Sequence, residues 1–469
     1  MLFSSTTFIF IFLTLLLILY FPIKNIKYRN IILLIFSLIF YSWGEPKYIF
    51  LMLITVLIAY IFGLLIDKYR FEKRKSKLFL IISVVLILLN LFIFKYLDFS
   101  IGIFNSIFKT NIGLSKLVLP IGISFYTFQI LSYVIDLYWG KVGVQKNYFR
   151  LLLYVSFFPQ LIAGPIVRYE TVEKEISDRK TTLDGFINGF KRFIWGLAKK
   201  VIIANNVAIF CDYIYNNYSS YGSNILWVAA ICYTLQIYFD FSGYSDMAIG
   251  LGKMFGFNFL ENFNYPYIAT SITDFWRRWH ISLSSFFRDY VYIPLGGNRV
   301  SKIKFIRNIF IVWLLTGIWH GASYNFILWG LYYAILLLIE KMVTGRYIEK
   351  LPKVLKILYS LFFITLGWVI FRVENINDLI LVIKKMFSFN NTSFVTLFNN
   401  NAMLISTIPY IILGIFLSLP IDKWFKEKVD KSNSVILTLI EDLILGVLFG
   451  ISIMFLVSNS YNPFIYFRF

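Results

Sequence analysis

The only two histidines in this chain of 469 residues, His280 and His320, are its candidates for acid–base chemistry. Histidine is the side chain whose ordinary pKa lies near neutral pH, so proton transfer at that pH falls most readily on an imidazole. Each histidine directly follows a tryptophan, and each lies where apolar sequence gives way to polar or glycine-rich sequence. We therefore take His320 and His280 as the candidate catalytic residues.

His320 lies in a glycine-rich stretch, Thr316-Gly-Ile-Trp-His-Gly-Ala322. Gly317, Gly321 and the later Gly330 permit a bend or a close approach of two backbones. A histidine at a helix break inside a membrane costs free energy unless it is paired or faces a wet cavity, which makes it a functional-site candidate. The alternative is a core histidine that a backbone carbonyl satisfies.

His280 closes the run Asp274-Phe-Trp-Arg-Arg-Trp-His280, within a block rich in arginine and tryptophan. The charged residues of this block are Arg277, Arg278, Arg288 and Arg299 with Asp274 and Asp289. Guanidinium groups bind phosphate or carboxylate through paired hydrogen bonds, so the block is a candidate site for an anionic ligand. The alternative is an interfacial belt, where tryptophan and arginine are common. The density of charge around one histidine favours a binding site.

Asp240 and Asp246 fall inside an apolar stretch. Buried carboxylates need partners, and we expect structural ion pairs with the downstream arginines rather than catalysis. The sequence contains no Gly-x-Ser-x-Gly motif and no phosphate-binding glycine loop. Two histidines and two cysteines are too few to suggest a dedicated zinc site. We therefore expect no metal and no bound cofactor.

Composition decides which elements must position these residues. The chain is 59% hydrophobic, with 51 Phe and 32 Tyr. Its apolar runs recur near the ~20 residues that cross a bilayer. This predicts an all-α polytopic membrane protein, with residues 1–469 forming a single membrane domain and no soluble module. We expect about 11 transmembrane helices, with the shorter apolar stretches re-entrant or interfacial.

The net charge of +20 does not indicate nucleic-acid binding, because the basic residues cluster between apolar stretches. The clusters lie at 24–29, 67–77, 299–307, 346–356 and 423–431. The positive-inside rule places them in the cytosol, where they also contact anionic lipid. Both termini are then external, with Tyr461–Phe469 outside. A basic cytosolic face would also attract a phosphorylated acyl donor.

This topology puts His320 at membrane depth or toward the outer face. His280 lies closer to the cytosolic cluster 299–307, so the two histidines are predicted to mark two ends of one path through the protein. The region 140–224 mixes acids and bases and gives no topology.

Several long motifs resemble the membrane-bound O-acyltransferase (MBOAT) family. They are Gln236-Ile-Tyr-Phe-Asp-Phe-Ser-Gly-Tyr-Ser-Asp-Met-Ala-Ile-Gly250, Glu261-Asn-Phe-Asn-Tyr-Pro-Tyr267, Phe275-Trp-Arg-Arg-Trp-His-Ile-Ser-Leu-Ser284, Pro294-Leu-Gly-Gly-Asn-Arg299 and Leu315-Thr-Gly-Ile-Trp-His-Gly321. Within the family the chain is similar to the bacterial polysaccharide O-acetyltransferase branch, which is alginate O-acetyltransferase-like. The resemblance is densest over residues 118–335.

The resemblance implies a ring of helices around a central tunnel. It matches His320 to the family's invariant histidine and His280 to its second histidine. It also implies acetyl transfer from acetyl-CoA in the cytosol to an extracellular or cell-wall polysaccharide, through a secreted or membrane-anchored SGNH-type acetyltransferase partner. The arginine block would receive the phosphates of acetyl-CoA, and Thr316, Ser323 or Asn325 would stabilise the oxyanion. The protein would lie in the bacterial cell membrane.

Two other functions remain open. Teichoic-acid D-alanyl transferases share the scaffold, although Pro294–Arg299 looks more like the polysaccharide acetyltransferases. A polymer transporter, or an inactive scaffold of an export complex, belongs to a different class. A transporter predicts pseudo-repeated halves, and the sequence shows no internal repeat. The two Trp-His pairs argue against an inactive scaffold.

Overall fold

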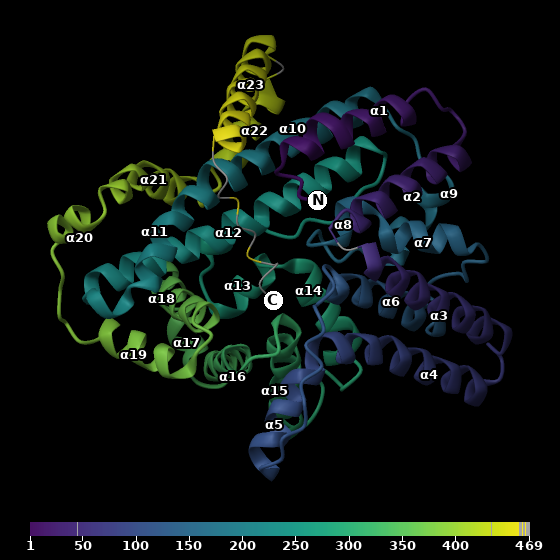
Figure 1. Cartoon of the computed structure of the whole chain (residues 1–469), viewed down its shortest axis with the longest axis horizontal. Helices are drawn as coiled ribbons and strands as arrows, with labels where there is room; N and C mark the ends of the chain where they lie inside the picture. The colour runs from purple at the N-terminus through teal and green to yellow at the C-terminus, as the bar shows by residue number, and fades with distance from the viewer. Residues whose placement is uncertain (45, 433, 459–461, 463–464, 466–469) are drawn as a thin grey trace. The chain divides into compact units, whose positions relative to one another are not determined.

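The computed structural model describes residues 1–469 except 45, 433, 459–461, 463–464 and 466–469 (Figure 1). Within these described residues all regular secondary structure is helical and no β-strand occurs. The predicted all-α class is therefore confirmed. The external position predicted for Tyr461–Phe469 concerns residues that lie largely outside the described part of the chain.

Eight helical segments of the described chain are long and apolar enough to cross a membrane. They are Pro46–Lys68, Lys73–Phe108, Leu183–Asn216, Ser223–Met254, Lys302–His320, Tyr324–Ile348, Lys353–Arg372 and Val435–Ser458. A ninth is obtained if Phe394–Asn400 and Ala402–Leu417, bent by 112°, form one span. The chain thus has the membrane-spanning segments of a polytopic protein, but fewer than the 11 or so that we expected.

The difference arises where apolar sequence forms short helices. The stretch 118–139 yields a helix of 16 residues, Ile123–Tyr138, whose start is delayed by Gly122 in the left-handed conformation. The stretch 151–166 is divided at Phe157, with Pro159 at the start of the second piece. Apolar composition alone does not show where a proline or glycine ends a helix.

The pattern of contacts divides the chain into two compact units, residues 1–193 with 245–260 and residues 194–244 with 261–469. The first unit contains η1 (Thr7–Leu13), α1 (Thr14–Tyr20), α2 (Ile26–Ser42), η2 (Pro46–Tyr48), α3 (Ile49–Lys68), α4 (Lys73–Leu91), η3 (Phe92–Tyr96), α5 (Leu97–Phe108), α6 (Ile123–Tyr138), α7 (Tyr148–Ser156), α8 (Phe158–Leu161), α9 (Tyr169–Ser177) and most of α10 (Leu183–Ala198). That residues 1–469 form one membrane domain stays a prediction.

A buried arginine joins separate segments of the first unit. Arg179 donates from Nη1 to Asn30 Oδ1 at 2.6 Å and from Nε to the Phe255 carbonyl at 3.0 Å. Its guanidinium also lies over the Phe257 ring, 4.5 Å from the centroid. Because burial makes its charge costly, Arg179 is held by several acceptors at once, and it connects α2 to the segment after α12.

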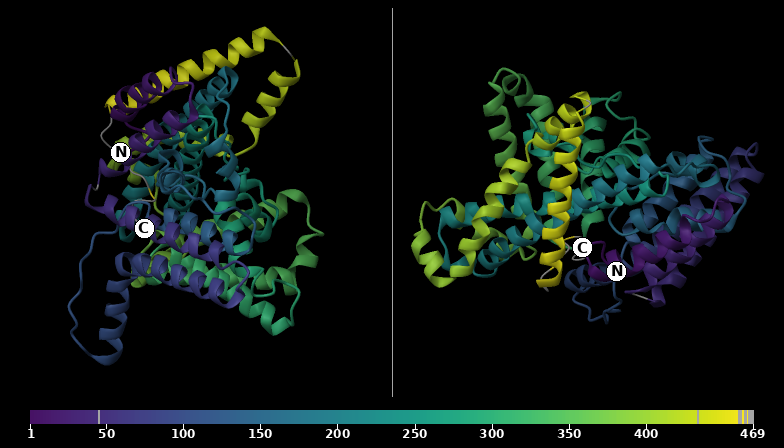
Figure 2. Two further views of the ribbon diagram at one scale, coloured as in Figure 1. Left: turned by 90° about the vertical axis from the view of Figure 1, so that its right-hand side faces the viewer. Right: turned by 90° about the horizontal axis from the view of Figure 1, so that it is seen from above.

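Figure 2 shows α5 extending from the α4 end of the first unit and the loop after it running back alongside. The Asp98 carboxylate holds this loop, because it accepts from the Ser115 backbone N–H at 2.8 Å and the Lys116 backbone N–H at 2.9 Å.

The second unit contains both candidate histidines and the arginine block. Its elements are η4 (Lys199–Ala204), α11 (Asn205–Asn216), η5 (Tyr218–Ser220), most of α12 (Ser223–Met254), η6 (Pro266–Ile268), α13 (Ile272–Arg278), α14 (Ile281–Phe287), η7 (Arg288–Tyr292), α15 (Lys302–His320), α16 (Tyr324–Ile339), η8 (Glu340–Thr344), α17 (Gly345–Ile348), α18 (Lys353–Arg372), α19 (Ile376–Met386), α20 (Phe394–Asn400), η9 (Ala402–Thr407), α21 (Ile408–Leu417), α22 (Ile421–Ser432) and α23 (Val435–Ser458).

Ion pairs satisfy the two aspartates of α12, as expected, but with other partners. Asp240 pairs with Lys200 at 2.6 Å, and both side chains are buried. Asp246 pairs with Arg192 at 2.8 Å. Both cations precede α12 in the sequence, so the prediction that the downstream arginines supply them was wrong. Asp240 Oδ2 also accepts from the backbone N–H of Ile465 at 2.8 Å, which ties Ile465 to this pair.

Two glycines let α15 and α16 approach closely. A Cβ at Gly317 would collide with the Phe326 carbonyl, and a Cβ at Gly330 would collide with the Trp313 carbonyl. Small residues at facing positions let membrane helices pack backbone against backbone. The contact places His320, the last residue of α15, against α16.

Replacement of Gly330 by leucine should destabilise this helix pair. Overpacking a tight interior costs about 1–3 kcal/mol, so the Tm of the purified protein should fall. The control is Gly446→Leu, because no atom lies within 4 Å of a Cβ at Gly446. Equal Tm values for the two variants would contradict the proposed close packing.

Candidate active site

The structure brings His280 and His320 to one aromatic side chain, Trp319. The Trp319 ring centroid lies 5.8 Å from that of His280 and 4.9 Å from that of His320. Both histidines are buried, with 1% and 5% of their surface exposed. Two residues 40 positions apart in the sequence thus flank a single indole. They lie much closer together than predicted, since we expected them at the two ends of a path through the protein.

His320 is enclosed by aromatic rings from α16 and α18. The centroids of Trp329 and Phe371 lie 5.0 and 5.1 Å from its own, and that of Phe326 lies at 6.4 Å. α15 ends at His320, and Gly321 follows in extended conformation, so the predicted helix break is confirmed. A Cβ at Gly321 would collide with the Phe326 ring, so the glycine lets this ring lie close to the backbone beside His320.

Asn325 holds the end of α18, which carries Phe371, in place beside His320. Its Nδ2 donates to the carbonyl of Phe371 at 3.0 Å and to that of Ile370 at 3.4 Å, at the end of α18. These carbonyls lack partners within their own helix, so Asn325 caps α18 and fixes Phe371 beside His320. Thr316 donates its hydroxyl to the Val312 carbonyl at 2.7 Å. The oxyanion role predicted for Asn325 would require its present bonds to break.

His280 lies between α13 and α14 with φ +43°, in the left-handed region that few residues other than glycine adopt. Its Nδ1 lies 3.1 Å from Asn262 Oδ1, and its ring meets Phe241 edge-on at 4.6 Å. Burial lowers the pKa of His280 from 6.5 to about 3. The imidazole is therefore neutral at physiological pH and does not attract a phosphate by its own charge.

The arginines of the block divide into two pairs. Arg278 donates to Asp274 at 2.9 Å, and Arg288 donates to Asp289 at 2.7 Å. The hydrogen bond to Asp289 raises the pKa of the Arg288 guanidinium. Arg277 and Arg299 have exposed side chains. A phosphate would compete with a bound carboxylate at Arg278 and at Arg288. Arg277 and Arg299 are therefore better placed to receive a phosphate.

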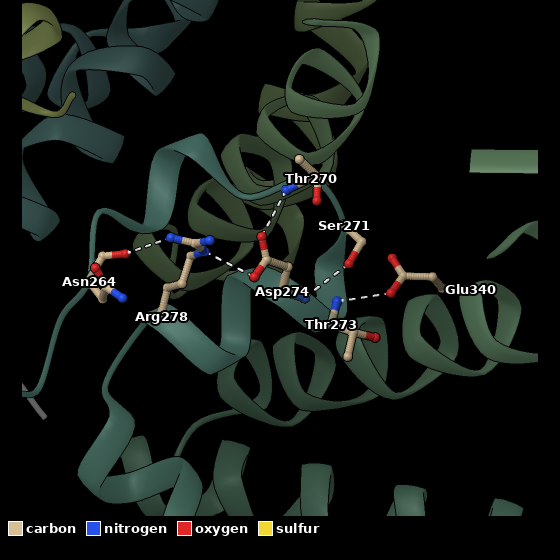
Figure 3. A network of polar contacts seen from close by, with 7 residues as sticks. All are labelled: Asn264, Thr270, Ser271, Thr273, Asp274, Arg278 and Glu340. Carbon is tan, nitrogen blue, oxygen red and sulfur yellow. Dashed lines mark hydrogen bonds and ion pairs between the residues drawn. The ribbon is translucent and has the colours of Figure 1, made fainter. Parts of the chain in front are cut away.

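Two carboxylates hold the short helix that leads to His280 (Figure 3). Asp274 accepts from Arg278 and from the Thr270 backbone N–H at 3.1 Å. Buried Glu340 accepts from the backbone N–H groups of Ile272 and Thr273 at 2.7 and 2.9 Å. An acidic group at a helix N-terminus is stabilised by the orphan N–H groups and the helix dipole.

Sequence reasoning missed Glu340 and Asn262. Glu340 is the first acidic residue after the apolar run of α16, and an ionisable group there is a signal that could have been followed. Asn262 lies in a quoted motif, but an asparagine gives no sign in sequence of which group it will contact. Among the described residues, no group of three or more His, Cys, Asp or Glu is arranged to hold a metal ion.

The chain has several helices long enough to span a membrane, which defines a polytopic membrane protein. Its second unit holds two buried imidazoles, which form a candidate acid–base site. Residues 35–379 match the model of the membrane-bound O-acyltransferase family, and the chain belongs to this family. The match extends beyond residues 118–335 at both ends.

Relatives with assigned activities agree with the family. The chain is 43% identical over 394 residues to a probable alginate O-acetylase of Pseudomonas aeruginosa, covering 83% of this chain and 75% of the relative. It is 35% identical over 520 residues to a peptidoglycan O-acetyltransferase of Helicobacter pylori, covering 100% and 98%. It is 33% identical over 260 residues to a teichoic acid D-alanyltransferase of Bacillus subtilis, covering 52% and 63%.

The burial of His280 predicts a pH dependence of stability. Because its pKa falls from 6.5 to about 3 on folding, the unfolded chain binds a proton between these pH values and the folded chain does not. This contribution to stability is fully present above about pH 6.5 and is lost progressively as the pH falls toward 3. His280→Gln removes the proton site, so its free energy of unfolding should fall less steeply with acidification. Parallel pH curves for wild type and variant would contradict a neutral buried His280.

Proposed function

We propose that the chain transfers acetyl groups from cytosolic acetyl-CoA to the opposite side of the bacterial cell membrane, for O-acetylation of a cell-wall or extracellular polysaccharide. The observation that carries the proposal is the pair of buried imidazoles around Trp319, in a member of an O-acyltransferase family. Similarity to a peptidoglycan O-acetyltransferase over the whole chain favours acetyl transfer, whereas the D-alanyltransferase matches about half of it.

The chemistry is an acyl transfer from sulfur to oxygen. An acceptor hydroxyl attacks the thioester carbonyl, the new C–O bond forms, and the C–S bond to coenzyme A breaks. His320 accepts the proton of the hydroxyl and returns it to the leaving sulfur. The apolar rings around His320 exclude water, which would otherwise hydrolyse the thioester.

Sidedness and partners form the finer part of the proposal. The basic clusters support a cytosolic donor face and external termini, by the positive-inside rule. We take the immediate acceptor to be an external SGNH-type acetyltransferase, which then passes the acetyl group to the polysaccharide. Arg277 and Arg299 are the arginines best placed to meet the phosphates of the donor, because Arg278 and Arg288 already hold carboxylates.

Acetyl transfer should require His320. In sealed inside-out vesicles, acetyl-labelled acetyl-CoA added to the cytosolic face should yield labelled ester in the lumen when the external partner is enclosed there. His320→Ala should abolish this signal, because the proposal assigns the hydroxyl proton to His320, while the variant still inserts and purifies. A D-alanyl-labelled carrier should give no ester. Ester formation by His320→Ala, or label that stays on the cytosolic face, would refute the proposal.

Donor recognition should depend on Arg277. A charge-assisted hydrogen bond contributes about 1.5–3 kcal/mol, so Arg277→Ala should raise the KM for acetyl-CoA by about tenfold or more with little change in kcat. The control is Lys350→Ala, which removes one exposed charge from the predicted cytosolic face. The difference should shrink at high salt. Equal KM values for the two variants would exclude Arg277 from the donor site.

A further inference from the structure

The contacts of Asn262 determine which nitrogen of His280 carries the proton. Asn262 Oδ1 accepts from the Ser282 backbone N–H at 3.1 Å and from the Ser282 hydroxyl at 2.8 Å. A backbone N–H can only donate, so the atom facing Ser282 must be the amide oxygen and not the amide nitrogen. The same oxygen lies 3.1 Å from His280 Nδ1, which must therefore donate to it.

We propose that Asn262 is a positioning residue that holds His280 in the tautomer with the proton on Nδ1, so that Nε2 acts as a fixed hydrogen-bond acceptor for a reacting group. In a neutral imidazole one nitrogen donates and the other accepts, and the partner of the first determines the role of the second. The importance of His280 for acetyl transfer rests on the proposed function, whereas the tautomer is a property of the chain itself.

The backbone around His280 is arranged for the same contact. The Asn262 carbonyl accepts from the Ile281 N–H at 2.9 Å, while its side chain accepts from the next N–H, that of Ser282. Asn262 thus caps α14 twice from a distant segment. With the backbone of His280 held in the left-handed region and its ring against Phe241, the imidazole has little freedom to turn. Conformations of this kind persist where the surrounding structure holds them, often at functional sites.

The chemical identity of the partner limits what His280 does. A carboxylate beside an imidazole stabilises the imidazolium, as in proton-carrying triads. An amide oxygen carries no net charge and offers no such stabilisation, and burial already disfavours the cation. His280 is therefore suited to align a hydroxyl or thiol by accepting a hydrogen bond, while His320 takes the proton.

The low histidine content allows a direct test. A chain labelled with ¹⁵N-histidine and purified with a non-histidine tag contains only two imidazoles, and His320→Gln leaves only the signals of His280. At neutral pH, Nδ1 should show a protonated and Nε2 an unprotonated nitrogen signal. Asn262→Ala should shift His280 toward the other tautomer and lower kcat by about tenfold, the equivalent of one lost hydrogen bond.

Two further variants separate this role from helix capping. Asn262→Asp keeps an acceptor and a cap, so it should keep the tautomer, and its charge should raise the pH at which His280 protonates. The control Asn264→Ala alters an exposed asparagine two positions away and should change neither the spectrum nor kcat. A protonated Nε2 in the wild type, or an unchanged tautomer in Asn262→Ala, would overturn the proposal. The expected tautomers in a chain that transfers no acetyl group would support it while contradicting the proposed function.

Discussion

The structure of the site is constrained by the free-energy cost of burying two imidazoles among aromatic rings. A buried polar group without a hydrogen bond costs roughly 2–7 kcal/mol, and a buried charge costs more. At His280 the structure meets this cost by keeping the ring neutral and giving Nδ1 an amide acceptor. At His320 the imidazole packs against the rings of Trp319, Trp329 and Phe371, which shield it from water.

Contacts between helices near the site keep the two imidazoles buried. The close approach at Gly317 and Gly330 holds α15 against α16, and so places His320, the last residue of α15, beside α16. Asn325 joins the start of α16 to the end of α18 and so sets the position of Phe371. On the His280 side, Glu340 anchors the first turn of α13. Each of these contacts ties one helix end to another element, where unpaired backbone groups would otherwise remain.

Local sequence predicted the features that depend on local chemistry. The apolar runs indicated a helical membrane protein, and the glycines around His320 indicated the break that ends α15. The partners of Asp240 and Asp246 were not predictable in this way, since a carboxylate does not show which of many cations the fold will bring to it. Fewer helices reach spanning length than expected, because Gly122 delays the start of α6 and Phe157 divides a second apolar stretch. Site assignments taken from the family motifs specified histidines, but not the neutral partner Asn262.

The proposed function assigns two tasks of different electrostatic character to α13 and the two residues that follow it. Arg277 is exposed, whereas Trp279 and His280, two and three positions later, are buried. Recognition of a phosphorylated donor needs full charges in contact with water, where binding them costs little desolvation. Transfer of an acetyl group needs neutral, oriented imidazoles where water is excluded. The short helix α13 can meet both requirements, because its first turn is held by Glu340 and Asp274. Arg277 on this helix is exposed, whereas the chain that follows turns toward the interior at His280, whose backbone is left-handed.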